Sequence, residues 1–567
     1  MSHFSYQFNV HILSHKAVVF SGSPALTSIQ FAAIIATEID LAKDLIMFLS
    51  GRLLTLALII VFLLSGCIKV GPDFQRPDSL VSPDWIESGD ERLRKRSVEY
   101  REWWKVFNDP FLDRLIDRAY RENLTLRIAG IRILEARAQL GIAIGNIFPQ
   151  TQQASGSVER IRTSESSPQA IPVYSQDQIG VNASWELDFW GRFRRSIESA
   201  NATWLATVAD YDNAMVSLTA DVANSYIAIR TLEKRLAIAR ENVETQKESL
   251  KIAEARLRFG TVTQLDVEQA QTVLNNTLAS IPLLETQLRQ QEDALCVLLG
   301  IAPRDLADLI KGASEIPVSP PQVIAGIPAD LLRRRPDIRS AEYQAAAQSA
   351  LIGVAKADLY PAFSLSGMFG FLSSNFDRSG LPDMFQWKNR MFQAGPSFQW
   401  NILNYGQITN NVRAQDARFQ ELLITYQNTV LRAQQDVEDN LSAFLRGQER
   451  AKYLALSTVA ARKALDLAAK QYRQGIIDFT TVLVAQQSLL NEQDNLAVAL
   501  GSISSGLVGV YRSLGGGWEI REGKELVPPA IKEEMAKRTN WGELLAPASY
   551  NPPVLTDPKP SIRPPDW

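Results

Sequence analysis

The residues best suited to catalysis or metal binding are scarce in this chain of 567 residues. All three histidines (His3, His11 and His15) lie close to the first residue. The two cysteines are Cys67 and Cys296, and Cys296 lies in an apolar run where it fits as a small core residue. Beyond His15 the chain therefore offers no His-based catalytic triad and no Cys/His zinc site.

The surroundings of Cys67 predict a different chemistry, the covalent attachment of lipid. Arg52 precedes the apolar run Leu53–Leu64, and the small residues Ser65 and Gly66 follow directly before the cysteine. This order is typical of a bacterial lipoprotein signal. The run is too short to span a bilayer, which needs about 20 residues. We expect cleavage before Cys67, with diacylglycerol on its thiol and an N-acyl chain on its amine. The alternative is a buried or membrane helix with an incidental cysteine.

Other sequence features narrow the compartment and the function. Met47 is a natural start for the signal, so residues 1–46 are interpreted as a mis-called start or an unusual extension before it. Ile68 follows the cysteine, where an Asp would favour retention in the inner membrane, so the outer membrane is favoured. No phosphate-binding or dinucleotide-binding glycine motif occurs in a strand-to-helix setting, and the formal charge of −3 gives no reason to expect nucleic acid. We expect neither an enzyme nor a cofactor other than the acyl chains.

Positions 190–300 recur at positions 405–515 with one constant offset in the numbering. Trp190-Gly191 matches Tyr405-Gly406, and Leu299-Gly300 matches Leu514-Gly515, with the same offset for both pairs (405 − 190 = 514 − 299 = 215). Chance matching among common residues would scatter this offset. For the earlier pair Phe148-Pro149 and Tyr360-Pro361 the offset is slightly smaller (360 − 148 = 212), so the copies differ little in length. The sequence predicts an internal duplication.

Each copy centres on a predicted helical hairpin. Residues 197–258 contain neither proline nor glycine, and apolar or small residues recur there at alternating spacings of four and three. This heptad pattern is typical of coiled-coil packing, and a helix of this length spans roughly 90 Å. The second copy carries the same pattern between Ala451 and Tyr472. We expect glycine C-caps at Gly260 and Gly475, with returning helices over about 263–299 and 479–514.

Between the hairpins the apolar period changes to two. Ile179, Val181, Ala183, Trp185 and Leu187 alternate with polar residues, and the segments 363–371 and 392–400 behave in the same way. Strands of about ten residues with this alternation are typical of a membrane β-barrel, although a soluble β-hairpin remains an alternative. Four strands cannot close a barrel alone, and open sheet edges cannot face lipid. A barrel would therefore require several copies of the chain.

Several stretches together resemble the TolC/OprM-type outer membrane efflux proteins, in particular their NodT-like lipoprotein branch. The matching stretches are residues 67–74 (CIKVGPDF) with Pro77, 103–110 (WWKVFNDP), 185–192 (WELDFWGR), 332–339 (LRRRPDIR) and the two hairpin turns. The resemblance covers roughly residues 67–518. It implies a membrane β-barrel joined to a long helical coiled-coil barrel, with four strands per chain completing twelve as a homotrimer.

The resemblance also implies a function and partners. The chain is expected to be a passive exit duct for drugs or other small molecules, anchored in outer-membrane lipid with its helical barrel in the periplasm. It would dock to a periplasmic adaptor (a membrane fusion protein) and an inner-membrane pump of the RND type, which supplies the energy. The alternatives are a duct for type I protein secretion or, in a different class, a periplasmic adaptor lipoprotein.

By the same resemblance, the periplasmic gate should lie just beyond the hairpin turns. Asp266 matches an acidic family position that forms charge rings restricting the pore. Its counterpart in the second copy is Thr481, and Val484 stands where relatives often have another Asp. A helix N-terminal carboxylate favoured by the helix dipole is an equally open interpretation of Asp266. The residues expected to contact the adaptor at the hairpin tips are Arg258, Phe259, Gly260, Tyr472, Arg473 and Gly475.

The expected organisation follows from the repeats and flanking segments. It runs as an extension and signal (1–66), a lipidated segment with equatorial helices (67–122), the first repeat (123–300), a linker (301–334), the second repeat (335–515) and a Pro-rich tail (516–567). We expect the tail to be extended or disordered, with a short helix near residues 530–538. Trp190 is expected to pack at a strand-to-helix junction, and the arginines at 333–335 to pair with nearby acids.

Overall fold

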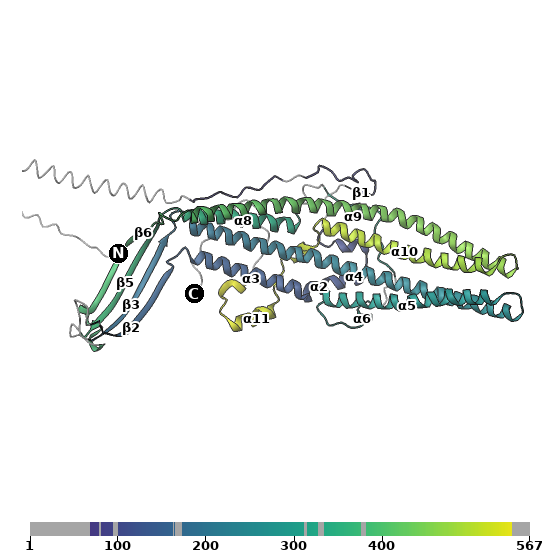
Figure 1. The fold of residues 1–567 in the computed structure, drawn as a ribbon, viewed down its shortest axis with the longest axis horizontal. Coiled ribbons are helices and arrows are strands. Elements are labelled where there is room, and N and C mark those ends of the chain that lie inside the picture. The colour runs from purple at the N-terminus through teal and green to yellow at the C-terminus, as the bar shows by residue number, and fades with distance from the viewer. Residues whose placement is uncertain are drawn as a thin grey trace, which may run out of the picture. The chain divides into compact units, whose positions relative to one another are not determined.

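The computed structural model describes residues 69–78, 81–94, 100–162, 164, 173–310, 315–326, 334–375 and 381–546. The predicted signal, Cys67 and the end of the tail lie outside these residues. The chain divides into two units at Ile68, and the following concerns the second unit, Lys69–Trp567. Within it, four strands extend from one end of a set of long helices (Figure 1).

The two repeats contain the same elements in the same order. The first comprises α3 (Leu124–Gly145), β2 (Thr151–Ile161), β3 (Tyr174–Leu187), α4 (Arg192–Arg258) and α5 (Gln264–Leu298). The second comprises α8 (Pro336–Ala357), β5 (Ala362–Ser374), β6 (Arg390–Gln399), α9 (Gln407–Arg473) and α10 (Phe479–Ser513). The long helices have 67 residues in both copies and the returning helices 35. The predicted duplication is confirmed.

The length difference between the copies lies in their strands and connecting loops. Helices α3 and α8 have 22 residues each, and their first residues differ by the smaller offset (336 − 124 = 212). The first residues of α4 and α9 differ by the larger one (407 − 192 = 215). A helix as long as α4 spans about 100 Å, slightly more than the sequence predicted because both long helices begin earlier.

The heptad positions of the first copy form the contact between the helices of its hairpin. Leu232, Leu236 and Ala239 are buried and pack against Leu284 of α5. Helix α10 is long and apolar enough to cross a membrane, but 56% of that apolar window is buried inside the chain, as in a core helix. Pro282 lies inside α5, whereas its counterpart Ala497 lies in the uninterrupted α10.

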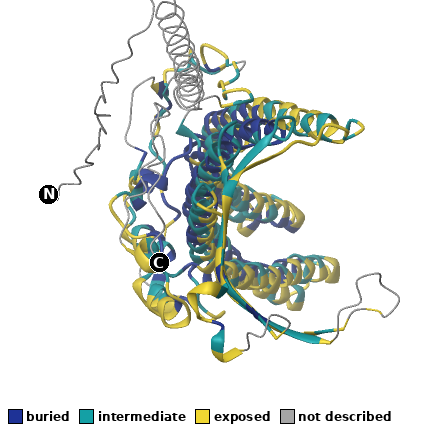
Figure 2. Ribbon diagram, turned by 90° about the vertical axis from the view of Figure 1, so that its left-hand side faces the viewer, coloured by how far each residue is buried: buried dark blue, intermediate teal, exposed yellow. Residues whose placement is uncertain are grey.

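Four antiparallel strands form one sheet in the order β2-β3-β5-β6. The two strands of each repeat are neighbours, and the repeats join through β3 and β5, so β2 and β6 each keep one unpaired edge. Viewed along the helices, the sheet is an open arc (Figure 2). The two remaining strands, β1 (Leu93–Arg94) and β4 (Val323–Ile324), form a separate parallel pair.

The largest core lies around the middle of the long helices. Trp103, Trp104 and Phe107 belong to the 3₁₀ helix η1 (Trp103–Phe107) and are buried there, with Trp103 stacked on Tyr511 of α10 at 5.3 Å. Asp109 caps α2 (Pro110–Glu122) and accepts a hydrogen bond from the Tyr226 hydroxyl at 2.8 Å. The WWKVFNDP stretch is therefore a structural connection between the N-terminal helices and both hairpins.

The start of the tail contains the short helix predicted near residues 530–538, but it is more ordered than the expected extended segment. It forms the 3₁₀ helices η4 (Trp518–Arg521) and η5 (Gly542–Leu545) and the helix α11 (Pro529–Arg538), and Trp518 and Arg521 are buried. The fully buried carboxylate of Asp212 on α4 pairs with Arg521 and with Arg339 of α8. The guanidinium groups of Arg521 and Arg339 also lie over the Trp518 ring, at 5.6 and 4.7 Å. These contacts hold the tail against both repeats.

Replacing Asp212 should destabilise the protein strongly. The Asp212→Asn substitution leaves two arginines without their shared anion, and breaking a buried pair in this way costs about 3–5 kcal/mol. Asp221→Asn is the matched control on the same helix, because the Asp221–Arg512 pair is about half exposed and such pairs contribute at most about 1 kcal/mol. Thermal unfolding in detergent measures both. Equal midpoints for the two variants would contradict this role of Asp212.

Candidate gate and membrane surface

The two faces of the sheet differ sharply in polarity. Register-paired residues share a face, so Val181, Ala154 and Phe369 lie together, as do Ile179 and Phe371. The same face carries Trp185 with Leu365 and Phe363 with Phe398. The opposite face carries Gln153, Asn182, Ser184, Ser366 and Gln393. Many of the apolar side chains are exposed, including Val158, Val181, Phe392 and Phe398. The alternation predicted from the sequence is present in β3, β5 and β6.

Tryptophans fasten this sheet to the helices. Trp190 donates a hydrogen bond to the Pro361 carbonyl at 2.8 Å and stacks on Tyr360 at 4.5 Å, which confirms its predicted packing role. Trp185 donates to the Ile147 carbonyl and Trp400 to the Leu359 carbonyl, both at 3.0 Å. Each of these indoles therefore satisfies a backbone carbonyl at the junction between strands and helices.

Both hairpin turns are built in the same way. Gly260 and Gly475 have positive φ angles of 69° and 74°, as expected for glycine at the end of a helix. Thr261 N–H donates to the Arg256 carbonyl and Gly260 N–H to the Leu257 carbonyl, and Ile476 and Gly475 repeat both bonds in the second copy. These are Schellman motifs, which satisfy the last carbonyls of α4 and α9.

The first turns of the two returning helices carry the same pair of residue types in opposite order. In the first copy Thr263 is the N-cap of α5, and Asp266 accepts hydrogen bonds from its backbone N–H (2.9 Å) and hydroxyl (2.8 Å). In the second copy Asp478 is the N-cap of α10 and accepts the corresponding bonds from Thr481, at 2.9 and 2.7 Å. The second copy therefore keeps a carboxylate at this turn, three positions before Thr481, where the sequence comparison found none. The structure thus shows Asp266 in the helix-capping role that the sequence left open.

One arginine joins the two hairpin tips. Arg256 of α4 donates to the Tyr472 and Arg473 carbonyls at the end of α9, at 3.1 and 3.3 Å. Its guanidinium group also lies over the Tyr472 ring at 4.2 Å. These carbonyls belong to the last turn of the helix, where backbone acceptors lack intrahelical partners. The counterpart of Arg256 is Gln471 (256 + 215 = 471), so the contact occurs in one direction only.

Apolar and polar contacts extend this junction along the hairpins. Tyr472, Phe479, Val482 and Leu483 of the second hairpin pack with Ala253 and Ala270 of the first. Farther from the tips, Arg235 of α4 pairs with Asp494 of α10 at 2.7 Å, and Asn242 donates to Gln493 at 2.9 Å. The two hairpins are thus joined at several levels within one chain.

The residues expected at the gate and at the adaptor surface differ in their exposure to solvent. Arg258, Phe259, Gly260, Arg473 and Gly475 are exposed, and Val484 is 64% exposed on α10. Tyr472 differs from them, because its side chain is only 6% exposed beneath Arg256 and beside Phe479. Its burial follows from its heptad position, which places it in the contact between the hairpins. Sequence reasoning did not single out Arg256, because no local motif marks it as the partner of the α9 carbonyls.

The chain just after Cys67 is fastened to the strand-to-helix junction. Val70 N–H donates to the Trp190 carbonyl at 3.1 Å. Buried Arg195 of α4 donates to the Val70 and Gly71 carbonyls at 3.0 and 2.9 Å. A Cβ atom at Gly71 would collide with the Cα atom of Gly353 on α8, so the segment fits only because both positions are glycine.

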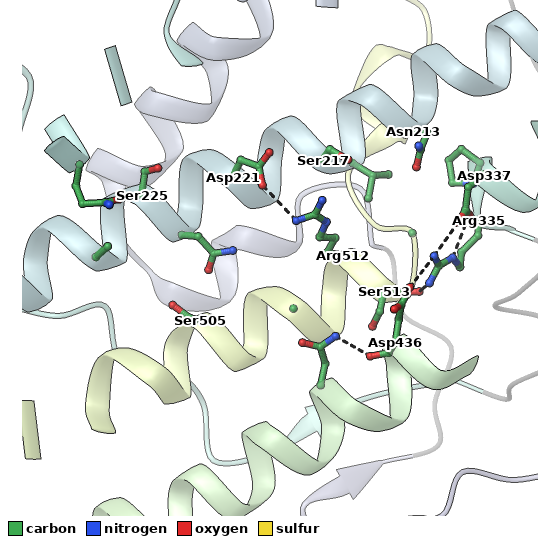
Figure 3. A pocket seen from close by; sticks show the side chains of 18 residues that line it. Asn213, Ser217, Asp221, Ser225, Arg335, Asp337, Asp436, Ser505, Arg512 and Ser513 are labelled. Atoms are coloured by element: carbon green, nitrogen blue, oxygen red, sulfur yellow. Dashed lines mark hydrogen bonds and ion pairs between the residues drawn. The ribbon is translucent and has the colours of Figure 1, made fainter. Parts of the chain in front are cut away.

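A polar cavity of about 940 Å³ lies between α4, α9, α10 and the start of α8 (Figure 3). Its charged groups are paired: Arg512 with Asp221 at 3.2 Å, and Arg335 with Asp337 and Asp436 at 2.8 and 3.1 Å. Burial raises the pKa of Asp221, and Arg512 partly opposes this rise. The remaining polar lining is largely asparagine and serine. Such a recess suits water and polar solutes, and Arg335 serves the structural pairing predicted for its cluster.

The family model for outer membrane efflux proteins matches the chain twice, over residues 115–301 and 327–516. The chain belongs to this family. The two matches coincide with the two repeats, and they confirm the predicted family, the role in efflux, the outer-membrane location and the absence of an enzymatic function. Because this family consists of efflux channel proteins, the curved sheet and the two hairpins of this chain are parts of a transport channel.

Curated relatives and solved structures agree with this assignment. The chain is 32% identical to the solvent efflux pump outer membrane protein SrpC of Pseudomonas putida, covering 82% of this chain and 99% of the relative. It is 30% identical to nodulation protein T of Rhizobium leguminosarum bv. trifolii, covering 77% and 92%. The outer-membrane channel OprN superposes with a TM-score of 0.74 at 33% identity, covering 80% of this chain and all of that chain.

Exchanging the capping residues of the first hairpin should preserve its stability. The double variant Thr263→Asp with Asp266→Thr reproduces the arrangement of the second copy, so we expect a change below about 0.5 kcal/mol, whereas Asp266→Ala alone should cost about 1 kcal/mol. Hydrogen exchange at residues 264–267 measures the fraying of this turn. Equal fraying in the double variant and in Asp266→Ala would show that the two caps are not equivalent.

Proposed function

We propose that the chain forms a homotrimeric exit duct, in which three four-stranded sheets close one twelve-stranded barrel in the outer membrane. The observation that carries this proposal is the sheet itself, with its exposed apolar face and its unpaired edges on β2 and β6. Unpaired backbone groups cannot face lipid, because nothing there replaces their hydrogen bonds to water. Pairing β6 of one copy with β2 of the next removes every edge.

The helices support the same assembly. Helix α4 has 29 buried residues, whereas its repeat α9, of equal length, has 10. Helix α9 exposes Ile424, Leu431, Leu456 and Leu467, among other apolar residues. A matching helix surface from the neighbouring copy would cover this apolar face, and the hairpins of three copies would then enclose a periplasmic tunnel of twelve helices.

In the proposed trimer, each part of the chain has a separate task in export. The helical tunnel reaches across the periplasm from the sheet, and its tips would meet a periplasmic adaptor through Arg258, Phe259 and the other exposed tip residues. Energy for export would come from an inner-membrane pump of the RND type. Cys67 would carry the acyl chains.

Channel formation is the direct test of this function. The purified full chain should run as a trimer in detergent by native mass spectrometry and should give conductance steps in planar bilayers. The variant Val181→Arg places a charge on the apolar face of the sheet, which costs about 2–4 kcal/mol at the centre of a bilayer, and should prevent insertion. Asn182→Arg is the matched control, because the neighbouring side chain lies on the polar face, and it should still insert. A monomeric wild-type chain without conductance would overturn the proposal.

We further propose that the contact of Arg256 with the end of α9 keeps the hairpin tips together and restricts the periplasmic aperture. Asp266 and Asp478 would contribute carboxylates near this aperture, with Val484 as an apolar neighbour and Thr481 holding Asp478. Hydrogen bonds from the Thr481 hydroxyl and backbone N–H keep the pKa of Asp478 below its ordinary value. The aperture would therefore keep this charge until the pH falls through that lowered pKa.

Replacing Arg256 should favour wider tips. Arg256→Gln removes a charge-assisted contact contributing about 1.5–3 kcal/mol, which corresponds to a shift of about tenfold or more in the balance between narrow and wide states. Single-channel recordings should show larger or more frequent open steps. Arg240→Gln is the matched control, because Arg240 forms an exposed ion pair with Glu285 within the first hairpin. Unchanged conductance in Arg256→Gln would exclude this restriction.

A further inference from the structure

The loop end of the apolar sheet face carries basic side chains. Arg160, near the end of β2, follows Val158 by two positions and so shares its face. Arg390, the first residue of β6, pairs in register with Phe371 of the same face. Both arginines are exposed, as is Lys388 just before β6. We call Arg160, Phe385, Trp387 and Arg390 the basic rim.

The aromatic residues of the basic rim are held in a defined arrangement. Phe385 packs edge-on against Phe371 at 5.6 Å, which places it at the apolar face of the sheet. The Arg390 guanidinium lies 4.6 Å from the centre of the Trp387 ring and donates to the Trp387 carbonyl at 2.7 Å. Asn389 in turn donates to the Asp383 carbonyl at 2.8 Å. Despite these contacts Phe385 and Trp387 remain 67% and 66% exposed.

The charges of the basic rim lack a matching anion within the described part of the chain. Arg160 forms no ion pair there, and Arg390 contacts only the Trp387 ring and carbonyl. Three carboxylates lie nearby. Asp177 pairs in register with Val158 and is buried, Glu159 belongs to the opposite, polar face, and Asp383 accepts from Gln386. An anion from outside the chain would complement the exposed guanidinium groups.

The position of the rim selects the kind of anion. Exposed Phe and Trp side chains beside an apolar strand face are typical of the boundary between hydrocarbon and headgroups. Arginine offers phosphate a planar, two-pronged donor, which a lipid headgroup at that depth can meet. We propose that the basic rim binds the phosphate groups of a phosphorylated glycolipid in the outer leaflet, with Phe385 and Trp387 against its sugar and acyl parts.

This inference rests on the proposed barrel, which also gives it a stoichiometry. Because β2 and β6 are the free edges of the sheet, each seam between copies receives Arg390 from one copy and Arg160 from the next. Two cations on adjacent strands repel one another unless an anion lies between them. The trimer would therefore carry three equivalent lipid sites, one at each seam.

Native mass spectrometry of the detergent-solubilised trimer tests the proposal with purified lipid A, the same lipid after enzymatic removal of its phosphates, and inorganic phosphate. The wild-type trimer should retain up to three copies of lipid A and bind the dephosphorylated lipid at least about tenfold more weakly, because charge-assisted hydrogen bonds are lost. Arg160→Gln and Arg390→Gln should each weaken lipid A binding to a similar extent. Arg418→Gln, an exposed arginine on α9, is the charge-matched control and should bind like the wild type.

Three results would overturn the basic rim as a phosphate site. The first is equal affinity of the wild-type trimer for lipid A and for the dephosphorylated lipid. The second is unchanged lipid A binding in both Arg160→Gln and Arg390→Gln. The third is a loss of lipid A binding in Arg418→Gln as large as in the rim variants. Saturation by inorganic phosphate alone, without preference for the lipid, would reject a lipid partner. The comparison of two lipids on the wild-type trimer remains decisive if a rim variant fails to fold. A wild-type chain that forms no conducting trimer would instead reject the proposed function.

Discussion

An unpaired strand edge is the constraint on which the rest of this architecture depends. Four strands with one apolar face cannot remain in lipid while β2 and β6 leave backbone donors and acceptors open. The same constraint gives meaning to the exposed apolar residues of α9, since closing the sheet around an axis also brings the hairpins of neighbouring copies together. The proposed assembly that pairs the edges of β2 and β6 would therefore also cover the exposed apolar residues of α9.

Duplication would allow one chain to build the long, regular tunnel that we propose. Equal lengths of α4 and α9, and of α5 and α10, put both turns at the same distance from the sheet. The Schellman turns at Gly260 and Gly475 then end both hairpins in the same way. Small departures from this symmetry are of functional interest, because both turns would lie at a common level of the proposed tunnel. The one-way contact of Arg256 with the end of α9 is such a departure.

The two copies share a capping interaction that a comparison of aligned residue positions does not reveal. Comparing Asp266 with Thr481 suggests a lost carboxylate, yet Thr263 and Asp478 complete the same capping pair in reverse order. Hydrogen bonding explains this equivalence, since either end of the pair can supply the acceptor for the first turn. A charge near the turn is thus retained in both copies, although aligned positions alone conceal it.

The sequence alone determined the repeat, the hairpins, the amphipathic strands and the family, because each rests on local periodicity or on contiguous motifs. Heptad spacing specified part of the buried seam of α4, including Leu232, Leu236 and Ala239, and glycine specified where each hairpin turns. Only the tertiary structure decided contacts between distant segments, such as Asp212 with Arg521, Arg256 with the α9 carbonyls, and the segment after Lys69 with Trp190. The burial of the tail's first turn belongs to the same group. No local pattern encodes such pairs, because their partners meet only after the two repeats have packed side by side.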